Sequence, residues 1–222
     1  MLTARYRTDY PGEFVVTEAR WRDGKREQTR EWIPNPIENR HISSRAACIG
    51  SSVDHYLFDY TRLARHRGGL LGSLRLQTYG VSEVAHQMKL DFAVEINKTR
   101  LNDLKATDYH EENVVYTTSR LCVENPGEFY LIPYNPVLNS IAVLLYLAAF
   151  DGHQEVFMLG YNQEADAGST NWIQHVARVI EAYSATRFVL VGVESNQPQA
   201  LFEYANVRPM SYPEFITYCD IR

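Results

Sequence analysis

The chain has few cysteines and no long hydrophobic run, and each absence removes a class of protein. Its three cysteines, Cys48, Cys122 and Cys219, lie far apart and form no CxxC pair. This spacing predicts neither a zinc site nor a disulfide framework, so we expect buried thiols in a reducing compartment. The longest apolar run, residues 141–150, is too short to cross a bilayer core of about 30 Å. Because no signal-like apolar segment follows Met1, the sequence favours a cytoplasmic protein that does not enter the membrane.

What the chain does contain is enough apolar material for a core and an uneven charge. Hydrophobic residues make up 45% of the 222 residues, which suits one domain with an appendage. The net charge is −5, yet residues 1–80 carry 13 basic and 9 acidic side chains, whereas residues 81–222 carry 9 and 18. A polyanionic partner would therefore meet the N-terminal third, unless these charges form only a solvated surface.

The N-terminal third has the pattern of a β-hairpin. Two β-prone stretches within residues 13–33 flank Asp23-Gly24, and Pro34 and Pro36 then favour an extended linker. We expect an arm and linker over residues 1–40 and a nucleotide-binding domain over residues 41–222. Cations and tryptophans share the arm, a combination suited to phosphate backbones and stacked bases. The candidate acceptor-binding residues are Arg20, Arg22, Lys25, Arg26 and Arg30. The same hairpin could instead join two copies of the chain in a homodimer.

The remainder alternates short apolar segments with helical ones. We expect strands at residues 45–50, 70–78, 91–96, 113–118, 128–132, 155–160 and 187–192, and helices at 53–66, 81–88, 137–150 and 171–184. This alternation is typical of an α/β protein with a doubly wound, mostly parallel sheet, in which ligands bind at the carboxyl ends of the strands.

Two segments are candidates for that ligand site. Gly50, Ser51 and Ser52 follow the first strand and precede an expected helix, an arrangement that suits a phosphate but also a plain helix N-cap. Asn139 and Ser140 begin the helix at 137–150, and the strand after it ends at Gly160, Tyr161 and Asn162. Asn139 and Ser140 would either bind a nucleotide or only cap their helix.

In order and spacing, these segments resemble the bacterial sialyltransferases that use CMP-sialic acid. The family's loop "GNGPSL", with an aspartate and "DYSRL" after it, is similar to residues 50–63, which end in Asp59-Tyr60-Thr61-Arg62-Leu63. The "RCNQ" strand and the third strand, which ends in asparagine, resemble residues 75–78 and 93–97. The "TSG" helix start resembles Asn139-Ser140-Ile141, and "KEIYLSGIDF" resembles residues 154–162. The likeness covers about residues 45–190 and leaves out the hairpin.

The resemblance implies a Rossmann-like fold and a site for a nucleotide sugar of the CMP or UDP type. Ser51 and Ser52 would approach the phosphate, and Gln77 and Asn97 would face the nucleotide or sugar. The full set of implied substrate-binding residues is Gly50, Ser51, Ser52, Gln77, Asn97, Asn139, Ser140, Gly160, Tyr161 and Asn162. Val137 offers no charge for the carboxylate of sialic acid, which favours a neutral sugar.

The chain differs from the family at the positions of the family's catalytic residues. Residues 163–170 contain neither the family's two tyrosines nor its histidine. Inverting glycosyl transfer needs a general base and a group that stabilises the leaving phosphate. The candidate catalytic residues are Asp166, Glu164, His175 and Asp54, each of which could equally be an ordinary surface residue. Paired acids beside the phosphates could instead hold a divalent cation, Mg²⁺ or Mn²⁺. The sequence contains no dedicated metal motif.

We therefore expect a glycosyltransferase that moves a sugar from a nucleotide sugar to a hydroxyl acceptor, such as a hydroxylated base in viral DNA. One alternative is a non-catalytic nucleotide- or DNA-binding protein that retains the fold. Another is a phosphoryl or pyrophosphoryl transferase of the same architecture.

Overall fold

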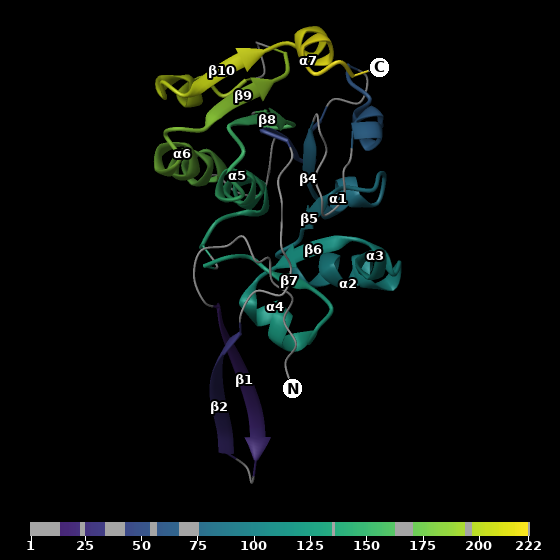
Figure 1. Cartoon of the computed structure of the whole chain (residues 1–222), viewed down its shortest axis with the longest axis vertical. Helices are drawn as coiled ribbons and strands as arrows, with labels where there is room; N and C mark the ends of the chain where they lie inside the picture. The colour runs from purple at the N-terminus through teal and green to yellow at the C-terminus, as the bar shows by residue number, and fades with distance from the viewer. Residues whose placement is uncertain are drawn as a thin grey trace.

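The computed structural model describes residues 14–22, 25–33, 43–53, 57–66, 76–134, 136–162, 171–193 and 197–221. Their main feature is a sheet of eight parallel strands in the order β10-β9-β8-β3-β4-β5-β6-β7 (Figure 1). The strands are β3 (Arg45–Ile49), β4 (Gln77–Val81), β5 (Phe92–Val94), β6 (Val114–Thr117), β7 (Tyr130–Leu131), β8 (Glu155–Leu159), β9 (Arg187–Val191) and β10 (Val207–Met210).

Helices cover the sheet on both sides. They are α1 (Ser82–Ala85), α2 (Lys98–Ala106), α3 (Tyr109–Glu112), α4 (Ser119–Glu124), α5 (Ser140–Phe150), α6 (Trp172–Ala182) and α7 (Tyr212–Tyr218), with 3₁₀ helices η1 (Tyr60–His66) and η4 (Gln199–Glu203). Figure 1 shows α5 and α6 on one side of the sheet, and α1, α2 and α7 on the other. The fold is therefore α/β, Rossmann-like and doubly wound, as predicted.

The direction of winding reverses between β3 and β8. The chain adds β4 to β7 outward from β3, and α5 then carries it back so that β8 pairs with the other side of β3. In sheets of this kind ligands bind outside the carboxyl ends of the strands at the point of reversal. The topology thus indicates that a ligand site, if present, lies at the loops that follow β3 and β8.

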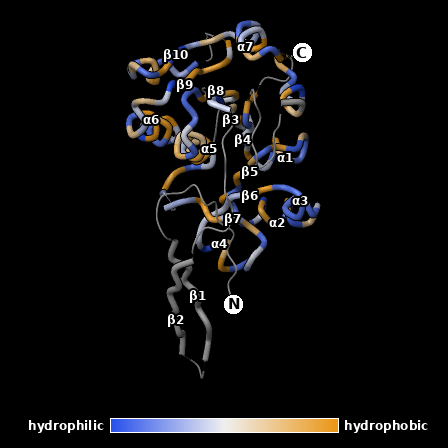
Figure 2. The backbone as a smooth tube through the Cα atoms, in the orientation of Figure 1, coloured by the Kyte–Doolittle hydropathy of each residue, from blue (hydrophilic) through white to orange (hydrophobic). Residues whose placement is uncertain are grey.

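Helix α5 is the central covering element. Eight of its eleven residues are buried, because the helix lies between the sheet and α6. Figure 2 shows its mostly hydrophobic character. The thiol of Cys48 on β3 donates a hydrogen bond to the carbonyl of Leu144 at 3.5 Å, which marks how closely the strand and helix approach. None of the described helices, α5 included, has the length and apolar character needed to cross a membrane.

The predicted hairpin is confirmed. Strands β1 (Phe14–Arg22) and β2 (Lys25–Ile33) pair antiparallel. Arg22 pairs with Lys25 and Trp21 with Arg26, so three of the candidate acceptor-binding residues stand in the two pairs nearest the turn. The predicted boundary at residue 40 lies outside the described residues.

Two predicted elements of the domain are wrong. The helix expected at 53–66 is a 3₁₀ helix that begins only at Tyr60, and Val53 and residues 57–59 are not helical. The strand expected at 70–78 begins instead at Gln77 and continues to Val81. Gly80, beyond the predicted end at residue 78, therefore lies inside the strand. A Cβ atom on Gly80 would lie 2.6 Å from the side chain of Leu90, so close packing explains the glycine.

Candidate functional site

The two loops at the point of reversal are joined to each other. The backbone N–H of Gly50 donates to the carbonyl of Leu159 at 2.8 Å, which extends the pairing of β3 with β8. Beyond it, the side-chain amide of Asn162 donates to the carbonyl of Ser52 at 3.0 Å. The predicted residues Gly50, Ser52 and Asn162 are therefore brought together, and Ser51 lies exposed beside them.

The glycines of these two loops allow their backbones to pack closely against each other. Gly160 has φ +75°, and a Cβ atom there would lie 2.8 Å from the backbone nitrogen of Val53. A Cβ atom on Gly50 would lie 3.0 Å from the carbonyl oxygen of Gly160. The resemblance implies that Gly160 binds substrate, but the close approach at this glycine is made by the chain itself. A ligand at this edge would lie outside the two loops rather than between them.

The N-terminus of α5 opens at the same edge. The side-chain oxygen of Asn139 accepts a hydrogen bond from the N–H of Ala142 at 3.1 Å, so Asn139 is the N-cap and Ser140 the first helical residue. The N-terminal end of a helix carries a partial positive charge that favours anions. The capping alternative for Asn139 is therefore correct, while the helix end remains suited to a phosphate.

Tyr161 is part of the core and does not face a ligand. Its side chain is 1% exposed, and its hydroxyl donates to the carbonyl of Ile141 at 2.7 Å. Burial raises the pKa of this hydroxyl well above its usual value. The predicted substrate contact of Tyr161 is thus replaced by a structural one, which ties the loop after β8 to the first turn of α5.

His175, on α6, stands next to this helix end. Its Nδ1 accepts a hydrogen bond from the backbone N–H of Asn139 at 3.1 Å. Because Nδ1 is the acceptor, the proton of the neutral ring is on Nε2. His175 therefore presents a hydrogen-bond donor, which suits a phosphate or ribose oxygen better than it suits the general base that we predicted. The other catalytic candidates, Asp54, Glu164 and Asp166, lie outside the described residues.

Gln77 lies at the opposite edge of the sheet from the other predicted ligands. It is the first residue of β4, is fully buried, and pairs in register with Ala46 near the start of β3. Four residues of strand, roughly 13 Å at the usual rise, separate it from the carboxyl end of β4. The shifted strand boundary explains the error, because we had placed Gln77 near the end of its strand.

Asn97 does lie at the carboxyl edge, but its side chain caps α2. Its side-chain oxygen accepts hydrogen bonds from the N–H groups of Thr99 at 2.9 Å and Arg100 at 3.3 Å. Since β5 is separated from β3 by β4, Asn97 flanks the point of reversal at a distance of two strands.

Glu95, which directly follows β5, was not among the predicted site residues. It is 1% exposed, and its carboxylate accepts hydrogen bonds from the N–H of Asn97 at 2.6 Å and from the hydroxyl of Ser82. Burial is the main cause that raises the pKa of this carboxyl group. Glu95 therefore holds together the loops that follow β4 and β5. The sequence signal that could have identified Glu95 is an acidic residue directly after a run of apolar strand residues.

Metal binding finds no support among the described residues, which contain no cluster of three or more histidine, cysteine or acidic side chains suited to an ion. Comparison of the chain with protein-family models, curated proteins and solved structures found no significant match. The resemblance to sialyltransferases stays a prediction.

Proposed function

We propose that the protein is a glycosyltransferase that binds a nucleotide sugar of the CMP or UDP type where the winding reverses between β3 and β8. One observation carries the proposal. The N-terminus of α5, the donor face of His175 and the serine-bearing loop after β3 belong to the one edge of the sheet where doubly wound folds bind nucleotides.

The phosphate would lie against the first turn of α5. The helix dipole and the hydroxyl of Ser140 favour negative charge there, and the Nε2–H of His175 would donate to a phosphate oxygen. As the glycosidic bond breaks, negative charge grows on the departing nucleotide phosphate. A donor already in position stabilises that charge, so His175 would assist departure of the leaving group.

The acceptor proton would go to a different group. Glu95 is too deeply buried to meet an acceptor and serves here as a positioning residue for the neighbouring loops. Asp54, Glu164 and Asp166 remain the proposed bases. The acceptor we propose is a hydroxylated base in DNA, which the basic hairpin would bind through Arg22, Lys25 and Arg26 and the other arginines of the arm.

Turnover with a panel of CMP- and UDP-sugars tests the proposal. We expect release of nucleotide with at least one donor, and a loss of about 100-fold in kcat for His175→Ala, as expected when one charge-stabilising donor is removed. Arg178→Ala, on an exposed position of the same helix, is the matched control and should keep full activity. Affinity for an acceptor DNA should fall steeply with added salt. A salt-independent affinity would remove DNA as the acceptor.

The second candidate is a nucleotide-binding protein without catalysis. It is favoured by the use of polar groups at this edge for internal contacts, as in Glu95, Asn97 and Tyr161. Binding of CMP or UDP with no turnover of any donor would select it over the transferase.

A further inference from the structure

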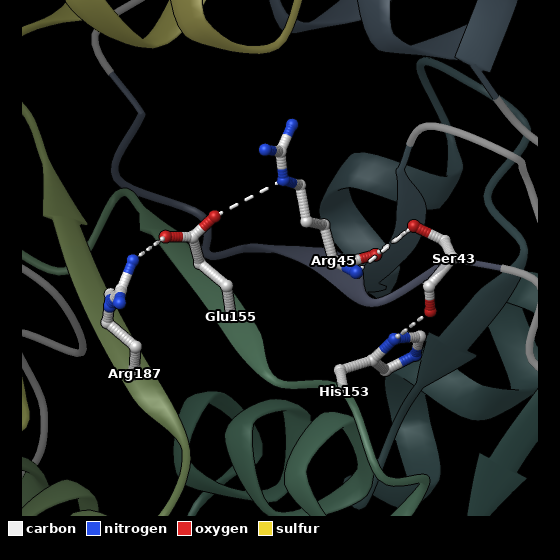
Figure 3. Close-up of polar contacts among 5 residues, drawn as sticks. All are labelled: Ser43, Arg45, His153, Glu155 and Arg187. Carbon is white, nitrogen blue, oxygen red and sulfur yellow. Dashed lines mark hydrogen bonds and ion pairs between the residues drawn. The ribbon is translucent and has the colours of Figure 1, made fainter.

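A row of charged residues begins three neighbouring strands at the amino edge of the sheet. Register pairs Arg45 of β3 with Glu155 of β8, and Glu155 with Arg187 of β9. The carboxylate of Glu155 lies between the two arginines, 3.3 Å from Nε of Arg45 and 3.1 Å from Nη1 of Arg187 (Figure 3). Neither the proposed transferase nor the core explains why three charged residues meet here.

This row is open because the covering helix ends before it. Phe215 of α7 packs against Phe157 of β8, on the same face of the strand as Glu155. Helix α7 then ends at Tyr218, and the guanidinium of Arg45 lies 4.4 Å from the centre of that ring. Beyond the helix end a groove of about 700 Å³ remains over the start of β3, β8 and β9.

A third arginine completes the groove. Arg208 of β10 pairs with Val189, two residues after Arg187, so Arg208 and Arg187 share a face of the sheet. Arg208 is exposed and forms no ion pair with any of the described residues. The groove therefore contains three guanidinium groups and one carboxylate, which leaves a net charge of +2.

Glu155 orients the arginines more than it neutralises the groove. Its side chain is only 10% exposed and is paired twice, whereas the side chain of Arg187 is 54% exposed. The terminal nitrogens of Arg45 point away from Glu155 (Figure 3). Two guanidinium groups are thus held in place by one acid while donor nitrogens remain directed elsewhere.

Part of the backbone beside the groove is already hydrogen-bonded by a side chain. The last turn of α6 ends beside it, and the side-chain amide of Asn206 donates to the carbonyls of Ile180, Tyr183 and Thr186 at 3.1, 3.3 and 3.1 Å. Three carbonyls in and after the last turn of α6 are therefore already engaged. What the groove offers a ligand is mainly positive charge and N–H donors, with the hydroxyls of Ser184 and Thr186 on its wall.

We propose that this arginine groove binds the phosphate group of a small phosphorylated molecule, at a site separate from the carboxyl edge. Guanidinium groups match phosphate oxygens in geometry and charge, and Arg45, Arg187 and Arg208 would supply them. The volume lies in the range of small-molecule sites. A second hollow of about 500 Å³ shares Tyr218 with the groove and would take a less charged part of the ligand. It is lined by Pro209, Met210, Pro213, Glu214, Thr217 and Tyr218.

Titration of the ¹⁵N-labelled protein with inorganic pyrophosphate, followed by amide NMR and calorimetry, tests this site. We expect saturable shifts of the amides at 184–187 and 205–208. Arg208→Ala should weaken the affinity about tenfold, the usual effect of losing one charge-assisted contact. Arg120→Ala, an exposed arginine near the opposite end of the sheet, should bind as the wild type does.

Three results with pyrophosphate would overturn the proposal. They are an absence of pyrophosphate binding, shifts confined to the loops at 50–52 and 139–140, and an affinity unchanged by Arg208→Ala. A twelve-nucleotide single-stranded DNA is the comparison ligand, and binding of that DNA alone would also overturn it, because the groove would then serve a polynucleotide. These outcomes do not decide the proposed transferase, which is tested separately by turnover of nucleotide sugars.

Discussion

The two edges of the sheet obtain positive potential in different ways. At the carboxyl edge it comes from the N-terminus of α5 and the donor face of His175, next to loops that contact each other through Gly50 and Gly160. At the amino edge it comes from Arg45, Arg187 and Arg208, which line an open groove. A helix end with neutral donors suits a ligand bound in one orientation, as catalysis requires. A cluster of full charges suits tight holding of an anion.

The edges also differ in what keeps them rigid. Beneath the amino edge a buried polar network links the hydroxyl of Tyr79 to the carboxylate of Asp151 and, at 3.0 Å, to His153. The other ring nitrogen of His153 lies 3.0 Å from the carbonyl of Ser43 (Figure 3). At the carboxyl edge the loops after β3 and β8 are held by close backbone contact at Gly50 and Gly160, together with the side-chain bond of Asn162. Substitutions at the amino edge therefore test buried hydrogen bonds, whereas substitutions at the carboxyl edge test the close packing of the loops.

The largest effect should come from closing the space between the two loops. Gly160→Ala places a methyl group against the backbone of Val53 in a left-handed conformation, so it should cost about 4 kcal/mol of unfolding free energy. Gly152→Ala has the same type of conformation, φ +88°, but no atom within 4 Å, and should cost only about 1 kcal/mol. Urea denaturation measures both. Equal losses would show that the loops do not constrain each other.

The next largest loss of stability should come from removing one buried tyrosine hydroxyl at each edge. Tyr79→Phe takes a donor from the buried carboxylate of Asp151 and should cost about 2 kcal/mol, whereas Tyr161→Phe leaves only a helix carbonyl without its extra partner and should cost about 1 kcal/mol. Both side chains are buried, so the packing change is matched. Thermal and urea unfolding of the two variants give the comparison. A greater loss of stability in Tyr161→Phe would contradict the expectation that the buried carboxylate of Asp151 depends more strongly on its hydroxyl donor.

The pH dependence of stability tests Glu95. Burial raises the pKa of its carboxyl group above its usual value of 4.5. The stability it contributes is therefore complete below pH 4.5 and is lost as the pH rises through the higher pKa of the folded state. Relative to Glu95→Gln, the wild type should lose stability as the pH rises from 4.5 to 7.

The matched control for Glu95 is Glu112→Gln. Glu112 is exposed, and a hydrogen bond from Lys89 lowers the pKa of its carboxyl group, so its effect on stability has the opposite sign and appears as the pH falls. Urea denaturation in steps of one pH unit from 4 to 8 resolves both curves. Identical pH profiles for the wild type and Glu95→Gln would contradict the role given to burial.

The smallest expected difference between the two edges is in the rate at which their cysteine thiols are labelled. Burial raises the pKa of Cys122 and of Cys219 to about 12 and raises the pKa of Cys48 well above its usual value, so none should react appreciably with iodoacetamide at pH 8 in the folded protein. Cys219 caps the short helix α7 at the amino edge, whereas Cys48 lies beneath α5. Mass spectrometry of the slow labelling should find Cys219 modified first. Earlier labelling of Cys48 would mean that α5 opens more readily than α7.

Much of the fold could be predicted from local pattern. The strand from Glu155 to Leu159 and the helix from Ser140 to Phe150 are apolar runs bounded by proline and glycine, and both were predicted within a few residues. Strand β10 and helix α2 were not. β10 is an edge strand with Arg208 and Pro209 in its middle, features that protect an edge but hide the strand pattern. α2 buries only Leu101 and Leu104, which leaves too few apolar positions to mark a period.

The site was harder to predict because its geometry depends on register and burial. The loops at Gly50 and Gly160 were correctly placed at one edge, since the ends of parallel strands converge. Gln77 was assigned to the wrong edge when its strand was shifted, and the burial of Tyr161 depends on its contact with the distant Ile141. The arginine groove could not be foreseen at all, because pairing alone brings its strands together.

The most direct test of the central claim is a crystal structure of the protein with CMP or UDP bound. Our account places the nucleotide phosphate against the first turn of α5, within hydrogen-bonding distance of Ser140 and of Nε2 of His175, and outside the joined loops at Ser52 and Asn162. A nucleotide bound only in the arginine groove, or no binding of either nucleotide at millimolar concentration, would contradict it.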